Sequence, residues 1–338
     1  GGVCFGTMDT WIMYQLTGKA VHATDYTNAA RTMLFNIRSL TWDIQLLHIF
    51  NIPLACLPVV YPSGHVFGHT RDVAGLPQGI PITAVMGDQQ AALYGQGCFE
   101  PGTMKNTYGT GCFMVLNTGK KFIHSTKGLL TTLACDEKGG PVFALEGSVF
   151  IAGAVVQWLR DELRVISDSA KTKKAIKGIN DTAGVYFVPA FVGLGAPYWN
   201  PNVRGIITGL TRGANQAHII RAALESIAYQ TKDVYDIMIK ESTLKIRALN
   251  VDGGATRNDF LMQFQAGLLS IPVNRPVMVD STVTGAAHLA GVTSGLWTIK
   301  DLGRMRKVEK VFKPLMSKAA VSEKYQGWKK AVHQALAA

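Results

Sequence analysis

The sequence predicts an α/β fold in which helices pack on the faces of a β-sheet. Apolar runs of strand length alternate with segments whose apolar residues recur at helical spacing, as where residues 248–251 precede residues 258–269. Glycine-marked corners follow several of these runs, and ligands of α/β sheets gather at such carboxyl ends of strands. Since 47% of the 338 residues are hydrophobic and 17% are charged, the chain can bury one large core or two.

The first part of the chain, residues 1–95, is predicted to be mixed α/β structure that forms the end of a larger unit. Residues 10–16 carry a helical pattern that ends at Gly18, and residues 42–50 carry a second one that Pro53 ends. The remaining elements expected here are a buried strand and a helix, at residues 82–86 and 89–94.

The second part, residues 96–338, is predicted to be another domain with a helical tail. Its most secure element is a long helix at residues 215–240, for which Asn215 is a good N-cap. The other expected elements are strands 103–107 and 112–116 around a glycine turn, strand 142–145, helix 153–163, strand 248–251, helix 258–269, strand 271–273 and helix 286–296.

Composition argues against several classes of protein. The formal net charge is +11, but the two basic runs, at residues 171–177 and 304–313, lack interleaved aromatic residues. We therefore predict solvated helix faces there and no nucleic-acid partner. No apolar run approaches the roughly 18 residues of a membrane span, so none is expected. The five cysteines form no C-x-x-C pair and the histidines no ligand set, which predicts a cytoplasmic protein without a metal site of its own.

The first glycine-marked corner is Gly87-Asp88-Gln89-Gln90, at the end of the strand expected at residues 82–86. A carboxylate at this place can act as a general base that takes a proton from an attacking hydroxyl. Asp is also favoured as the N-cap of a helix, so the residues alone leave Asp88 open between these two roles.

Two further corners have the character of nucleotide contacts. In Tyr108-Gly109-Thr110-Gly111, backbone amides and the Thr110 hydroxyl could face a phosphate, or the segment could be a simple hairpin turn. In Asp252-Gly253-Gly254-Ala255, an adenosine could lie against the glycines and bond to Asn258, or the segment could be a tight strand-to-helix turn. Neither corner is a Walker A loop or a G-x-G-x-x-G fingerprint.

Together these features resemble the FGGY family of carbohydrate kinases, in the actin-like ATPase (ribonuclease H-like) superfamily. The second signature of that family is matched by two segments, residues 205–210 and residues 218–225, which a seven-residue gap separates. The motifs that resemble the glycerol-phosphorylating branch, rather than the xylulose or gluconate kinases, lie at residues 25–36, 87–93, 106–113 and 157–161.

The resemblance implies transfer of the γ-phosphoryl group of ATP, with Mg²⁺, to glycerol, giving glycerol 3-phosphate. Asp88 would be the base, Gln89 would hold the polyol, and Phe113 would pack on its carbon edge unless it is a simple core residue. The nucleotide, ATP or ADP, would be contacted by Thr110, Gly153, Gln157, Gly254 and Asn258. We also expect a homo-oligomer.

The chain departs from the family pattern at its beginning. Family members start well upstream with a phosphate loop, which is absent here, so we expect a truncated form that is inactive alone. By the resemblance, residues 1–95 would be the C-terminal remnant of the first FGGY lobe, with the catalytic Asp on the glycerol side, and residues 96–338 the complete second lobe, which binds nucleotide. Residues 73–79 lack the Gly/Arg-rich character of the effector loop of many bacterial members, and that regulation is not predicted. The alternatives are a catalytically inert nucleotide-binding or interaction module, or another FGGY sugar kinase.

Overall fold

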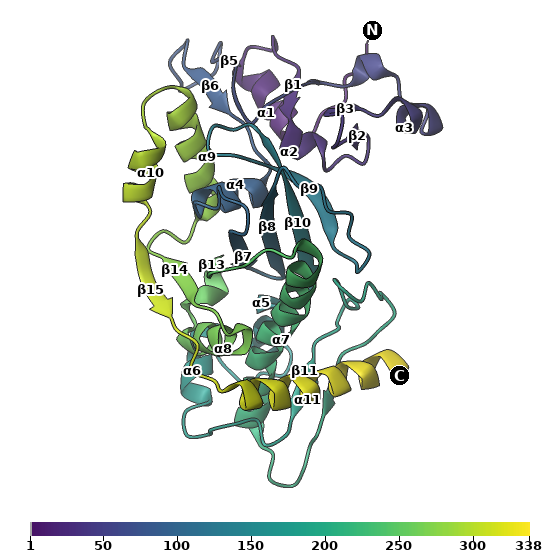
Figure 1. The fold of residues 1–338 in the computed structure, drawn as a ribbon, viewed down its shortest axis with the longest axis vertical. Helices are drawn as coiled ribbons and strands as arrows, with labels where there is room; N and C mark the ends of the chain where they lie inside the picture. The colour runs from purple at the N-terminus through teal and green to yellow at the C-terminus, as the bar shows by residue number, and fades with distance from the viewer. Residues whose placement is uncertain (1) are drawn as a thin grey trace.

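A seven-stranded mixed sheet forms the centre of the computed structural model, which describes residues 2–338 (Figure 1). The strand order is β15-β14-β13-β7-β8-β10-β9. Strands β7, β13 and β14 run parallel, and the other neighbours pair antiparallel. The strands are β7 (Met104–Tyr108), β8 (Cys112–Gly119), β9 (Leu130–Cys135), β10 (Pro141–Val149), β13 (Leu249–Asp252), β14 (Val273–Pro276) and β15 (Val308–Phe312).

Helices cover both faces of this sheet. On one face α5 (Gly153–Asp161), α7 (Gln216–Ser242) and α8 (Asp259–Leu269) share the main hydrophobic core with β7 and β8. On the other face lie α4 (Asp88–Gly95) and α9 (Ser281–Thr293), which pack on each other (Figure 1). The chain also forms α6 (Thr172–Ala175), β11 (Tyr186–Val188), β12 (Ile206–Thr208), α10 (Ile299–Met305) and α11 (Lys318–Ala337).

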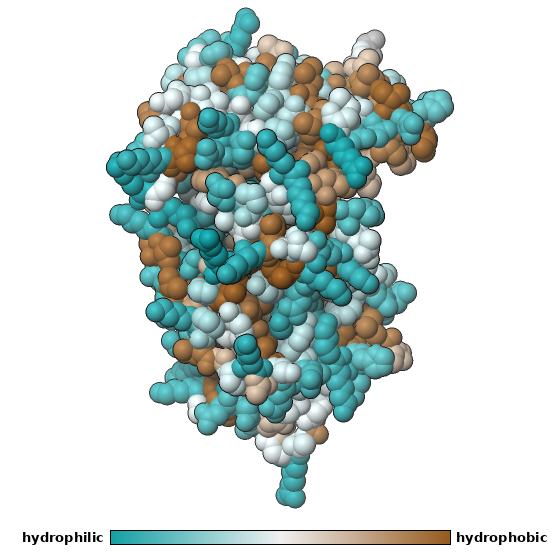
Figure 2. Space-filling view, in the orientation of Figure 1, coloured by the Kyte–Doolittle hydropathy of each residue, from teal (hydrophilic) through white to brown (hydrophobic). Residues whose placement is uncertain are grey.

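The first 86 residues form smaller elements at one end of the long axis (Figure 1). The strands described in this part pair only into two-stranded sheets. Hydrophobic side chains are exposed around α1 and α3, where Figure 2 shows patches of brown. The elements are α1 (Met8–Leu16), β1 (Ala23–Asp25), α2 (Tyr26–Ala29), β2 (Phe35–Asn36), β3 (Thr41–Trp42), α3 (Ile44–Ile49), β4 (Val59–Tyr61), β5 (Gly64–His69) and β6 (Pro81–Ala84).

Most of the predicted elements are present, and the exceptions have physical reasons. The long helix is α7, and the Asn215 side chain caps it by accepting from two backbone amides. The prediction of a helix face at residues 304–313 is wrong for its second half, which is the edge strand β15. Phe312 is 2% exposed there and pairs with Val273, so tertiary packing overrides the basic composition. No helix among residues 2–338 is long and apolar enough to cross a membrane.

The C-terminal helix α11 is fastened to α7 through Asp233, which is 2% exposed. Its carboxylate accepts hydrogen bonds from Trp328 Nε1 at 2.8 Å, Tyr325 Oη at 2.5 Å and Tyr198 Oη at 3.0 Å, and it pairs with Lys329 at 2.8 Å. One side chain on α7 therefore satisfies several polar groups that burial has removed from water.

We expect Asp233→Ala to lower the free energy of unfolding by about 3 kcal/mol, because it leaves buried donors unsatisfied. Thermal unfolding, together with amide hydrogen exchange in α11, measures the effect. Asp236→Ala on the same helix is the control. Asp236 is 40% exposed and pairs with Lys232, and such an exposed ion pair stabilises the fold by at most about 1 kcal/mol. Equal losses from both variants would contradict this role of Asp233.

Candidate functional site

A cavity of about 600 Å³ lies at the carboxyl edge of the parallel strands. Strands β7 and β13 are neighbours there, with Thr107 beside Asp252, so the segments that follow both strands meet. All five residues predicted to bind nucleotide line this cavity: Thr110, Gly153, Gln157, Gly254 and Asn258. Its volume is within the range of small-molecule sites in proteins.

Two glycines allow the backbone segments around the cavity to touch. Gly253 has a φ of +87°, and a Cβ atom there would lie 2.4 Å from the carbonyl oxygen of Tyr108. A Cβ atom on Gly153 would lie 2.5 Å from the carbonyl oxygen of Gly109, to which the Gly153 amide donates a hydrogen bond of 2.9 Å. Gly254 differs from both, because open space lies where its Cβ would be.

The polar residues of these two corners also have structural roles. Thr110 is exposed in a hairpin turn, and its carbonyl accepts from the Ala152 amide at 2.8 Å. Asn258 caps α8 by accepting from the Leu261 amide at 3.2 Å, and its Nδ2 donates to Thr172 Oγ1 at 3.1 Å. The hairpin turn and the strand-to-helix turn, which the sequence left open as alternatives to ligand contacts, are therefore both present. They form the wall of the cavity.

Asp88 lies outside this cavity, at the start of α4. The N-cap of α4 is Gly87, so the alternative of Asp88 as a helix cap is wrong. Its exposed carboxylate accepts from the Gln89 backbone amide at 2.9 Å and from Gln89 Nε2 at 3.0 Å. A carboxylate with free access to solvent at a strand-to-helix corner can accept a proton from a ligand.

Strand β7 links Gln89, the neighbour of Asp88, to Phe113. Lys105 Nζ donates to Gln89 Oε1 at 2.5 Å and to Thr107 Oγ1 at 2.7 Å, and Thr107 is the β-sheet partner of Phe113. Phe113 is 36% exposed, so the alternative of a simple core residue is wrong. The predicted substrate residues thus form a second group, which β7 joins to the cavity.

Buried charges lie beneath this second group, and the sequence analysis did not identify them. Lys105 is fully buried; burial lowers its pKa, and the carboxylates of Asp252, Glu146 and Asp88 oppose that shift. Asp252 Oδ1 is buried and accepts no hydrogen bond from residues 2–338. Within the same described range, no cluster of His, Cys, Asp or Glu could hold a metal ion. Lys105, Asn106 and Thr107 are three consecutive polar residues in this strand, a pattern from which the sequence could not predict such burial.

The motif at residues 25–36 connects the first part of the chain to the buried charges and to the corner that carries Asp88. Arg31 forms a bidentate pair with Glu146, with Nη1 to Oε2 at 3.0 Å and Nη2 to Oε1 at 3.2 Å. Thr27 Oγ1 donates to Asp25 Oδ2 at 2.7 Å and accepts from the Gly87 amide at 2.8 Å. These contacts hold the corner that carries the Asp88 carboxylate.

The sequence was compared with protein families and with curated relatives. Residues 104–294 match the C-terminal domain, and residues 3–95 the N-terminal domain, of the FGGY family of carbohydrate kinases. The chain belongs to this family. Glycerol kinase 2 of Thermotoga maritima is 53% identical to this chain over an alignment 338 positions long, which covers 99% of this chain and 68% of the relative. Glycerol kinase of Shewanella sp. strain ANA-3 is 55% identical over 333 residues, 98% of this chain and 67% of the relative.

Solved structures of FGGY proteins share the fold. Plasmodium falciparum glycerol kinase with ADP has a TM-score of 0.91 at 36% identity, over 98% of this chain and 66% of that chain. Xylulose kinase of Lactobacillus acidophilus has a TM-score of 0.85 at 24% identity, over 98% of this chain and 67% of that one, and shows the fold alone. The predicted actin-like ATPase fold and the predicted likeness to glycerol kinases are confirmed. The chain described by this structure spans about two thirds of the length of these relatives.

We expect Thr27→Val to lower the free energy of unfolding by about 1–3 kcal/mol, because it leaves the buried Gly87 amide without its acceptor. Hydrogen exchange at the Gly87 amide should become faster than in the unaltered chain. Thr284→Val, whose hydroxyl bonds only to the Asp280 carbonyl of its own helix turn, is the control and should leave that amide unchanged. Unaltered exchange at Gly87 in the Thr27 variant would show that this hydroxyl does not hold the corner.

Proposed function

We propose that the protein transfers the γ-phosphoryl group of ATP to a terminal hydroxyl of glycerol. The observation that supports this most is that the five residues expected to contact nucleotide line a single cavity, which strand β7 joins to the Asp88 group. The glycerol kinases among the relatives support the choice of substrate, and the neighbour solved with ADP supports the choice of nucleotide.

The nucleotide would lie along the cavity. The adenosine would rest on the loop of Gly254 and Asn258, and the phosphates would extend toward Thr110, with Gly153 and Gln157 at the border. Lys173 and Arg257 also line the cavity and provide positive charge for an anionic ligand.

Mg²⁺ would enter with the phosphates of the nucleotide. The exposed carboxylate of Asp88 suits the preference of Mg²⁺ for oxygen ligands, with water and phosphate oxygens as the others. When bound, the ion neutralises charge on the transferred group.

The substrate group would position the polyol and remove its proton. Asp88 would accept the proton of the attacking hydroxyl, while Gln89, held by Lys105, would donate a hydrogen bond to the polyol or to Asp88. The exposed ring of Phe113 offers an apolar surface to the carbon edge of glycerol. Phosphoryl transfer depends mostly on such positioning and on charge stabilisation.

Two alternatives differ from this proposal in what they predict. An inert nucleotide-binding or interaction module would bind ADP and give no glycerol 3-phosphate in any form, and another FGGY sugar kinase would prefer a different polyol in a substrate screen. A homo-oligomer and a cytoplasmic location stay predictions.

We expect Gly254→Ala to weaken the binding of Mg-ADP by about tenfold while leaving the thermal midpoint unchanged. The added methyl group meets no protein atom within 4 Å and would occupy space that the ligand uses. Isothermal titration calorimetry measures the affinity, and a tenfold loss corresponds to about 1.4 kcal/mol. Gly303→Ala in α10, which also meets no atom within 4 Å, is the matched control. Equal ADP affinity in both variants would place the nucleotide elsewhere.

In a form of the protein that has the full length of its relatives, we expect Asp88→Asn to reduce glycerol phosphorylation at least about 100-fold, because the amide cannot accept the proton. The affinity for Mg-ADP should stay within about fivefold, because Asp88 does not line the cavity and would meet the nucleotide only through the ion. A coupled assay for glycerol 3-phosphate and calorimetry measure the two effects, with the exposed Asp72→Asn as the control. Phosphorylation that survives the Asp88 change would exclude this residue as the base.

A further inference from the structure

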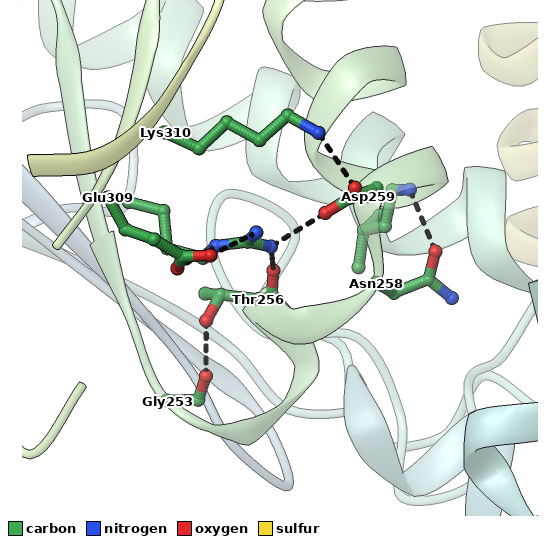
Figure 3. Close-up of polar contacts among 8 residues, drawn as sticks. Gly253, Thr256, Asn258, Asp259, Glu309 and Lys310 are labelled. Carbon is green, nitrogen blue, oxygen red and sulfur yellow. Dashed lines mark hydrogen bonds and ion pairs between the residues drawn. The ribbon is translucent and has the colours of Figure 1, made fainter. Parts of the chain in front are cut away.

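Arg275, on strand β14, contacts the loop behind the cavity without lining the cavity itself. Its side chain is 7% exposed. Nη1 donates to the Thr256 carbonyl at 2.6 Å and to Asp259 Oδ1 at 2.8 Å, and Nε and Nη2 donate to the Glu309 carboxylate at 2.8 and 3.1 Å (Figure 3). A single guanidinium thereby joins this loop to the edge strand β15.

These hydrogen bonds hold the loop at its middle and at its end. Thr256 is fully buried, and its hydroxyl donates to the Gly253 carbonyl at 2.6 Å (Figure 3). Asp259 is the first residue of α8. Gly254 and Asn258 face the cavity instead, and each shortly precedes an anchored residue, Thr256 or Asp259. The side of the loop away from the cavity is therefore fixed.

The charges around Arg275 suit this role. Asp259 also accepts from Lys310 Nζ at 2.8 Å, and the hydrogen bonds from Lys310 and Arg275 hold its pKa below the usual range. Asp259 is thus ionised at neutral pH, at the positive end of a helix. Arg275 donates four hydrogen bonds from three nitrogens of its planar fork, whereas a lysine has three donors on a single nitrogen and could not make all four.

We propose that Arg275 is a positioning residue for the nucleotide, which holds the loop of residues 253–258 in the conformation that accepts the adenosine. The inference rests on the proposed function, since it assigns the adenosine to this loop. A loop that is ordered before binding spares the ligand the entropy cost of ordering it, so the anchor raises affinity although it never touches the ligand.

The test uses the 338-residue chain with Mg-ADP as the probe. Arg275→Gln should weaken ADP binding about tenfold, the factor that corresponds to one lost charged hydrogen bond. Without nucleotide, the amides of residues 254–258 should exchange hydrogen faster in this variant. Arg275→Lys should bind with intermediate affinity, because it restores the charge without the fork.

Arg306→Gln is the matched control. Arg306 is also partly buried and donates to Asn250 Oδ1 at 2.8 Å and to Gln96 Oε1 at 3.3 Å, at the other end of β13 and without a hydrogen bond to the loop. This variant should lose stability while its ADP affinity stays within about twofold of the unaltered chain. A merely structural role of Arg275 predicts that the two variants behave alike.

Glu309→Gln covers the case in which Arg275→Gln does not fold. Glu309 is half exposed, and its change weakens two of the four anchoring bonds, so about threefold weaker ADP binding is expected. The inference is overturned if the folded variants at positions 275 and 309 bind ADP as the unaltered chain does, or if Arg306→Gln weakens binding equally. Failure of the unaltered chain to bind ADP would instead overturn the proposed function. Loop exchange would then still decide whether Arg275 holds the loop.

Discussion

The parallel pairing of β7 with β13 is the constraint on which the candidate site depends. Its register places Thr107 beside Asp252, so the turn after one strand and the loop after the other emerge at the same edge of the sheet. The two segments touch because Gly253 has no side chain and a positive φ. Helix α5 reaches the same place through Gly153, which lies against the Gly109 carbonyl. The cavity is therefore a consequence of backbone contacts among segments that are distant in the sequence.

The same pairing places charge beneath the substrate group. Lys105 and Asp252 lie on the face of the sheet that α4 covers, and both are removed from water. Buried charges cost free energy unless they are paired or hydrogen-bonded. Lys105 meets this requirement partly by bonding to Gln89, so the orientation of a partly exposed side chain depends on a buried one. Glu146 meets it through Arg31, which comes from the first part of the chain.

Sequence was sufficient to predict the corners but could not separate the roles of residues within them. Gly253 and Gly254 are adjacent and chemically identical, yet one is required by its conformation and the other faces open space. That difference depends on the Tyr108 carbonyl, which only the folded sheet brings near. For the same reason Lys105 and Arg275 could not be recognised, because their partners are distant in the sequence and join them only through strand pairing.

The two halves of the site differ in how they are held. The nucleotide half is braced from behind by Arg275 and by the contact of Gly153 with the Gly109 carbonyl, all within residues 104–338. The substrate half consists of exposed side chains: Phe113 lies on strand β8, and Asp88 lies on a corner that Thr27 holds from the first part of the chain. Local stability follows the number of buried contacts, so the first half should stay ordered when the second opens. Nucleotide binding therefore depends little on the contacts of the first 86 residues. Glycerol phosphorylation depends strongly on them.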